Sequence, residues 1–179
     1  IAPVTSGFID SRQRSCHATD LYYLLERLIL SPPKVVEQTL TQRVKAFYDE
    51  TPFPNYDDLD SVEALINKAQ QSYFARMLDE QVPLQAKVLE CGCGTGQLSN
   101  FLSIKSRDVI GVDLSLNALK LGQTFAQSQG LNTVRFINGN LFSVPLPSAY
   151  FDLVISNGVL HHTAQPQQGI ERICLLYTS

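Results

Sequence analysis

Glycines and carboxylates stand at regular positions where two apolar runs end. The first run ends in Glu90 and leads into three alternate glycines, Gly92, Gly94 and Gly96, and the second run ends in Asp113. A glycine turn lets the backbone lie against a ligand because no Cβ intervenes. A carboxylate can accept hydrogen bonds from both vicinal hydroxyls of a ribose. The pattern predicts a strand, a tight turn, a helix and a second parallel strand of a nucleotide-binding α/β sheet.

The glycine spacing separates two kinds of nucleotide ligand. Dinucleotide folds carry G-x-G-x-x-G, whose last glycine brings a helix N-terminus close to a pyrophosphate. That last position is Gln97 here, and the chain has no Tyr-x-x-x-Lys pair. We therefore expect a ligand with a ribose and without a requirement for phosphates. An NAD-linked oxidoreductase stays a further alternative.

Four segments, residues 90–96, 113–115, 138–141 and 151–162, follow one another along the chain. Together they resemble the class I S-adenosylmethionine-dependent methyltransferases, near the group of ubiquinone and menaquinone biosynthesis. The resemblance covers about residues 84–173. It implies S-adenosyl-L-methionine as cofactor and methyl transfer by in-line displacement to a small-molecule acceptor.

The resemblance also implies roles for single residues. Glu90 is expected to orient the methionine end of the cofactor, and Asn140 to accept from the adenine amino group. Asn157 is expected to contribute a backbone carbonyl, and Asp113 to bind the ribose; the alternative is that Asp113 only caps a helix. The expected cofactor-binding residues are Glu90, Gly92, Cys93, Gly94, Thr95, Gly96, Asp113, Leu114, Asn140, Leu141 and Asn157.

Residues outside these motifs are candidates for contact with the acceptor. His161 and His162 follow the fourth strand, where a histidine could take a proton from the attacking group. The alternative is polar packing of a loop. Tyr48 and Tyr73 precede the sheet, where relatives build a lid over the cofactor, although aromatic residues at helical spacing more often belong to the core.

Cys91 and Cys93 form a C-x-C pair inside the glycine turn. Zinc knuckles use C-x-x-C spacing and a second pair, so we expect no metal site. The four cysteines of the chain are expected to be reduced thiols of a cytoplasmic protein.

Composition sets the outer limits. The chain has 179 residues, a hydrophobic share of 44% and a formal net charge of −3. These values favour a globular domain with a sizeable core and give no sign of nucleic-acid binding. No apolar run approaches the roughly 18 residues that a membrane span needs.

The expected elements are read from apolar periodicity and capping residues. We predict helices over residues 19–30 and from about 32 to 49, and a rigid linker over 51–56. A helix opened by a capping box of Asp60 and Glu63 should bury Val62, Ile66, Ala69, Tyr73 and Met77. The sheet should start near Ala86, and crossover helices should cover about 96–104 and 115–128, the second between a Ser115 cap and Gly130.

The predicted fold class is α/β: a Rossmann-like doubly wound parallel sheet, strand order 3-2-1-4, with an N-terminal helical cap. A dozen residues with two prolines separate strands three and four, so no long helix is expected there. The predicted parts are 1–57, a loop and helical segment; 58–83, a lead-in helix; 84–173, the cofactor-binding domain; and 174–179, a tail whose native or non-native origin stays open.

The sequence therefore predicts an S-adenosylmethionine-dependent methyltransferase. The runner-up is a non-catalytic cofactor-binding or interaction module. We further expect that the chain is incomplete at both ends and holds four of seven strands. By itself it should be inactive, and either poorly soluble or only partly folded. The acceptor and the oligomeric state stay open.

Overall fold

The structure is a computed structural model that describes residues 34–177, and their side chains from residue 39 onward. The helix predicted over residues 19–30 lies outside this range. Within residues 34–177, none of the helices combines the length and the hydropathy that a bilayer span requires.

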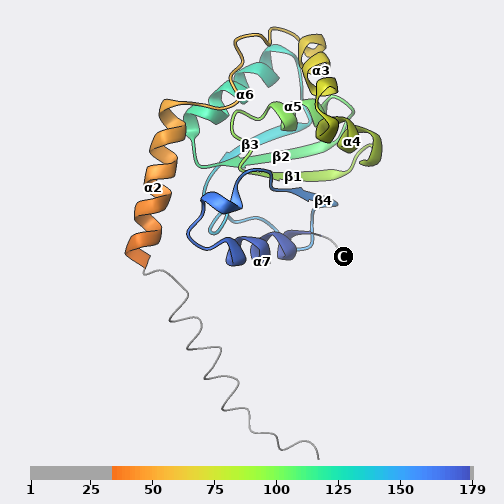
Figure 1. Cartoon of the computed structure of the whole chain (residues 1–179). Coiled ribbons are helices and arrows are strands. Elements are labelled where there is room, and N and C mark those ends of the chain that lie inside the picture. The colour runs from red at the N-terminus through yellow and green to blue at the C-terminus, as the bar shows by residue number, and fades with distance from the viewer. Residues whose placement is uncertain (1–33, 178–179) are drawn as a thin grey trace, which may run out of the picture. The chain divides into compact units, whose positions relative to one another are not determined.

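Four parallel strands form the centre of the fold (Figure 1). They are β1 (Lys87–Cys91), β2 (Asp108–Asp113), β3 (Val134–Asn138) and β4 (Leu153–Ile155), in the order β3-β2-β1-β4. The predicted order 3-2-1-4 is therefore confirmed. β1 lies between β2 and β4, so the chain reverses its winding direction beside β1, where open α/β sheets bind ligands at their carboxyl ends.

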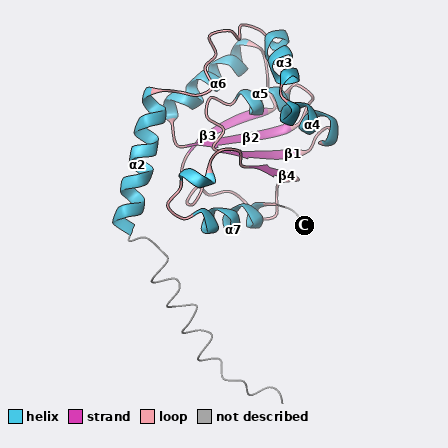
Figure 2. Cartoon of the chain, in the orientation of Figure 1, coloured by secondary structure: helices cyan, strands magenta, loops and turns pink. Residues whose placement is uncertain are grey.

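Helices cover both faces of the sheet (Figure 2). α3 (Val62–Gln71), α4 (Tyr73–Gln81), α5 (Gln97–Ser103) and α6 (Leu116–Ser128) lie on one side, and α7 (Pro166–Leu176) lies on the other. Alternate β1 residues supply the two cores: Val88 packs in the cluster with α3 to α6, and Leu89 packs in the cluster with Leu176 of α7. This alternation is the period of two that a strand imposes.

The two crossover helices form where the sequence predicts them. Ser115 caps α6 by accepting from the amide of Ala118, and Gly130, just beyond the helix, has a φ of +67°. α5 starts after Gly96, which has a φ of +71° and supplies no side-chain cap. Between β3 and β4 the structure has turns and no long helix, as predicted.

The segment before the sheet differs from the prediction in two ways. The cap of α3 is Ser61, which accepts from Ala64, and not the predicted Asp60 with Glu63. The helix also breaks at Ser72, which ends α3 and caps α4. Because of this break, the face with Tyr73 and Met77 turns outward. Tyr73 is 74% exposed, and the buried side chains are Leu65, Ala75 and Leu78.

Helices at the two ends of the described range complete the fold. α2 (Lys34–Glu50) agrees with the predicted second helix. α7 continues through residues 174–176, which we assigned to a separate tail. Leu176 is fully buried, and Tyr177 forms a parallel bridge with Phe151. These last residues therefore pack as part of the domain.

Candidate functional site

A cavity of about 830 Å³ lies at the carboxyl ends of β1 and β2. Its walls come from α2 to α5, the glycine turn and the loops after β2, β3 and β4. Eleven of the predicted site residues line it: Tyr48, Glu90, Gly92, Cys93, Gly94, Asp113, Leu114, Asn140, Leu141, Asn157 and His162. Four predicted residues, Tyr73, Thr95, Gly96 and His161, do not line it.

Glu90 is the last residue but one of β1 and is a buried carboxyl group in the cavity wall, 7% exposed. Its oxygen Oε2 accepts from the Ser99 hydroxyl at 2.5 Å. Burial raises the pKa of Glu90 from its ordinary value of 4.5 to about 7; the hydrogen bonds from the hydroxyl and amide of Ser99 oppose this rise, and the Asp113 carboxylate adds to it. Near neutral pH, a cationic ligand group would favour the charged form of Glu90.

Asp113 ends β2 and uses both carboxylate oxygens to organise the neighbouring loops. Oδ2 accepts from the Gly94 amide at 2.8 Å, and Oδ1 accepts from the Ser115 amide at 2.8 Å. Each carboxylate oxygen has a second lone pair, so both can still accept from a ligand hydroxyl. The capping role and the ribose role, which the sequence offered as alternatives, are therefore compatible.

The three alternate glycines allow other parts of the chain to approach the turn closely. All three have positive φ angles, from +55° to +71°. A Cβ at Gly92 would lie 2.2 Å from the Val159 side chain, and one at Gly96 would lie 2.2 Å from the Phe136 ring. At Gly94 it would lie 2.3 Å from the carbonyl oxygen of Phe53. The close contacts that require glycine are thus contacts within the protein.

Residues 53–56, which we name the strap, run along the outside of the glycine turn. Thr95 is fully buried, and its hydroxyl donates to the carbonyl of Pro54 at 2.5 Å. Gln97 donates to the carbonyl of Asn55 at 2.5 Å. The Thr95 hydroxyl is thus engaged by the strap and Thr95 does not line the cavity, while contact of Thr95 with a cofactor stays a prediction. The sequence identified the strap as a linker, but gave no signal that it binds this turn.

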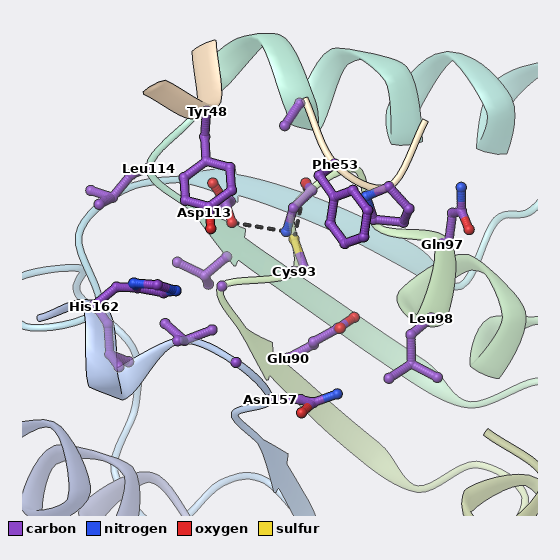
Figure 3. Close-up of a pocket in the computed structure, with 18 of the residues that line it drawn as sticks. Tyr48, Phe53, Glu90, Cys93, Gln97, Leu98, Asp113, Leu114, Asn157 and His162 are labelled. Atoms are coloured by element: carbon purple, nitrogen blue, oxygen red, sulfur yellow. Dashed lines mark hydrogen bonds between the residues drawn. The ribbon is translucent and has the colours of Figure 1, made fainter. Parts of the chain in front are cut away.

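Tyr48 and Phe53 lie on one side of the cavity, and Glu90 and Asn157 lie on the other (Figure 3). The C-terminal end of α2 is held by Asp49, which accepts from the hydroxyl of Ser115 at 2.7 Å. This contact fixes the position of Tyr48 beside the loop after β2. Phe53 lines the cavity and is nevertheless 70% exposed, so a ligand in the cavity could cover its ring.

The loops after β3 and β4 form the remaining wall. The side-chain oxygen of Asn140 accepts from the backbone amide of Phe142 at 3.0 Å, which stabilises the turn. His161 and His162 belong to a short 3-10 helix, Leu160–His162, with their ring centroids 3.9 Å apart. Of the two, His162 lines the cavity, which makes it the better candidate for contact with an acceptor.

Cys91 and Cys93 are buried free thiols. Burial raises the pKa of Cys91 to about 12 and raises that of Cys93 well above its ordinary range. Both thiols therefore stay protonated near neutral pH and are poor nucleophiles. Over residues 34–177, no three His, Cys, Asp or Glu side chains gather in a way that could hold a metal ion.

The chain is similar in sequence to known methyltransferases. Residues 89–175 match the family model described as a methyltransferase domain. An uncharacterized methyltransferase of Mycobacterium tuberculosis is 33% identical over 108 residues, 59% of this chain and 53% of that protein. A demethylmenaquinone methyltransferase of Bacillus pumilus is 29% identical over 123 residues, 66% of this chain and 51% of that protein.

Among solved structures, a magnesium protoporphyrin IX methyltransferase from Synechocystis PCC 6803 superposes with a TM-score of 0.61 at 24% identity. The match covers 77% of this chain and 72% of that one, and it shows a shared fold. Residues 89–175 thus match a methyltransferase domain in sequence, and the described part of the chain shares the fold of this solved structure. The chain spans about half the length of the Mycobacterium and Bacillus relatives.

Proposed function

We propose that the protein binds S-adenosyl-L-methionine in the 830 Å³ cavity and transfers its methyl group to a small-molecule acceptor. The observation that carries the proposal is the position of two carboxylates, Glu90 and Asp113, on either side of the glycine turn beside β1. That place is where a doubly wound sheet binds a nucleoside.

The residues present fit this cofactor. Asp113 retains acceptor capacity for the two ribose hydroxyls, and Glu90 offers a carboxylate to the α-ammonium group of the methionine end. The cavity lies near the upper end of the roughly 300–1,000 Å³ that small-molecule sites occupy. It therefore has room for the cofactor and for part of an acceptor.

When bound, the cofactor would supply a methyl group on a sulfonium, whose bond to the methyl carbon breaks to leave the neutral thioether S-adenosylhomocysteine. The protein then has to align the acceptor and exclude water. Correct alignment of reacting atoms can lower a barrier by roughly 7–11 kcal/mol. In this proposal His162 takes up the proton that the acceptor loses, and Tyr48 and Phe53 cover the site.

The lining indicates the kind of acceptor. Apolar side chains of four helices, Val44, Leu65, Phe74 and Phe101, face the cavity. They suit an acceptor with an apolar ring or tail, and the similarity to a demethylmenaquinone methyltransferase supports such an acceptor.

Two measurements test the proposal. Isothermal titration calorimetry should show binding of S-adenosylhomocysteine and no comparable binding of NAD. The reverse result would favour an oxidoreductase and overturn the proposal. Transfer of labelled methyl groups from the cofactor to a compound in a metabolite extract should follow. Cofactor binding without transfer to any compound would indicate a non-catalytic module.

A further inference from the structure

The backbone amides of the glycine turn are all used within the protein. The amides of Gly92 and Cys93 donate to the carbonyl of Val112 at 2.7 and 3.1 Å. Gly94 donates to Asp113, and Gly96 donates to the carbonyl of Cys93 at 2.9 Å. The fifth amide, that of Thr95, donates to Phe53 in the strap at 3.4 Å.

This arrangement differs from a phosphate site. A glycine turn binds phosphate by pointing free N–H groups at the anion. Here the amides of residues 92–96 all donate within the protein. Of the three amides in the first turn of α5, those of Gln97, Leu98 and Ser99, that of Ser99 donates to Glu90. A phosphate at this turn would lose its hydration without gaining these hydrogen bonds.

The strap is held in place by side chains on the turn and on α5. Three of them donate to consecutive strap residues: Thr95 to Pro54, Gln97 to Asn55, and Asn100 to the hydroxyl of Tyr56 at 2.8 Å. The strap thus presents carbonyl oxygens to the outer side of the turn. Gln97 stands where a dinucleotide fold has its third glycine, and in this chain it anchors the strap.

The charged side chains of the cavity also oppose a phosphate at the turn. Two carboxylates, Glu90 and Asp113, line the cavity next to the turn, and the one lysine or arginine in the cavity lining, within the described residues, is Lys68 on α3. The two carboxylates favour a cationic substituent at the turn and oppose an anionic one. S-adenosylmethionine carries a sulfonium at the 5′ carbon of the ribose, where ADP and NAD carry phosphates.

We propose that the strap makes the site selective against nucleosides with a 5′ phosphate, and that Thr95 is the positioning residue that holds the strap in this state. The site accepts a nucleoside whose 5′ substituent is cationic or neutral. This inference rests on the proposed function, because it assumes that the nucleoside ribose binds at Asp113. The glycine motif alone does not provide this selectivity against 5′ phosphates, because the strap lies outside the motif.

A comparison of three adenosine ligands tests the selectivity. S-adenosylhomocysteine, 5′-methylthioadenosine and ADP share the adenosine and differ at the 5′ carbon. By calorimetry or competition, ADP should bind at least about tenfold more weakly than 5′-methylthioadenosine. Equal or tighter binding of ADP overturns the inference, and overturns it alone if S-adenosylhomocysteine still binds. If S-adenosylhomocysteine does not bind, the proposed function falls, and the inference falls with it.

Variants of Thr95 test the role of the strap. Thr95→Val removes the hydroxyl with little change of shape, and should lower the preference for 5′-methylthioadenosine over ADP by about threefold to tenfold. Thr95→Ser should restore it. Thr133→Val is the matched control. It also removes a threonine hydroxyl that donates to a backbone carbonyl, in this case that of Ser103 at 3.0 Å. Thr133 directly precedes β3.

A structural role of Thr95 alone would lower thermal stability without changing the ratio of the two affinities. An unchanged ratio in Thr95→Val, or an equal change in Thr133→Val, therefore overturns the assignment of Thr95.

Discussion

Replacement of Gly94 by alanine provides a quantitative test of the contact between the strap and the glycine turn. Gly94 has a φ of +55°, and its added Cβ would lie 2.3 Å from the carbonyl oxygen of Phe53. Ordinary contacts begin at 3.4 Å, so the strap or the turn must move by about 1 Å. The neighbour is backbone, which cannot rotate out of the way as a side chain can.

Gly130 is the matched control for this substitution. Its φ is +67°, and a Cβ there would meet nothing within 4 Å. Gly130→Ala should therefore carry only the backbone cost of a left-handed alanine, about 1–2 kcal/mol. Gly94→Ala should carry the same cost and, in addition, about 1–3 kcal/mol for the overpacked contact. The gain from reduced freedom of the unfolded chain is common to both variants and cancels in the comparison.

Urea unfolding followed by circular dichroism measures this difference, because the chain has no tryptophan for fluorescence. A chain of this size should also show a melting temperature lower by about 2–4 °C for each kcal/mol. Gly94→Ala should weaken S-adenosylhomocysteine binding, and Gly130→Ala should not. Equal free energies of unfolding for the two variants, with equal affinities, would refute the account of the strap.

Three further changes test the cavity itself. Burial raises the pKa of Glu90 from 4.5 to about 7. Its contribution to the free energy of unfolding is therefore present below about pH 4.5 and is lost as the pH rises to about 7. Glu90→Gln should remove this pH dependence, which urea titrations at several pH values measure. Asp113→Ala should weaken S-adenosylhomocysteine binding by about 1.5–3 kcal/mol, whereas Asp152→Ala, which removes an acceptor for a β1 amide at the opposite end of the sheet, should leave the affinity measured by calorimetry unchanged. Phe53→Trp introduces the only tryptophan of the chain at a 70% exposed position; its emission should shift to the blue with S-adenosylhomocysteine, and a constant spectrum would remove Phe53 from the ligand site.

The arrangement of the sheet could be predicted because its signals are local. Apolar runs that end in Glu90 and Asp113 define β1 and β2; β2 ends at Asp113 as predicted, and β1 ends one residue after Glu90, at Cys91. Ser115 and Gly130 mark the limits of α6 correctly, since capping depends on one side chain and one backbone angle. The ends of parallel strands then meet at one edge of the sheet, which brings most of the predicted site residues together.

The errors before the sheet arise where neighbouring residues have similar propensities. Asp60 and Ser61 are both good N-caps, and the sequence does not show which of them starts α3. Ser72 can lie within a helix or cap one, and here it does the latter between α3 and α4. The break shifts the helical phase, so the face that contains Tyr73 becomes exposed instead of buried.

The orientation of Thr95 depends on a contact between distant parts of the chain. Its hydroxyl binds Pro54, 41 positions earlier, and no local pattern encodes that contact. The glycines show the same principle, because each makes room for a different segment: Gly92 for the loop after β4, Gly94 for the strap and Gly96 for β3. A G-x-G-x-G turn is usually taken as evidence of a ligand, yet here each glycine is already required by a contact within the protein. The ligand is therefore selected by what these segments leave open, a cavity with two carboxylates and no unpaired amide on the glycine turn.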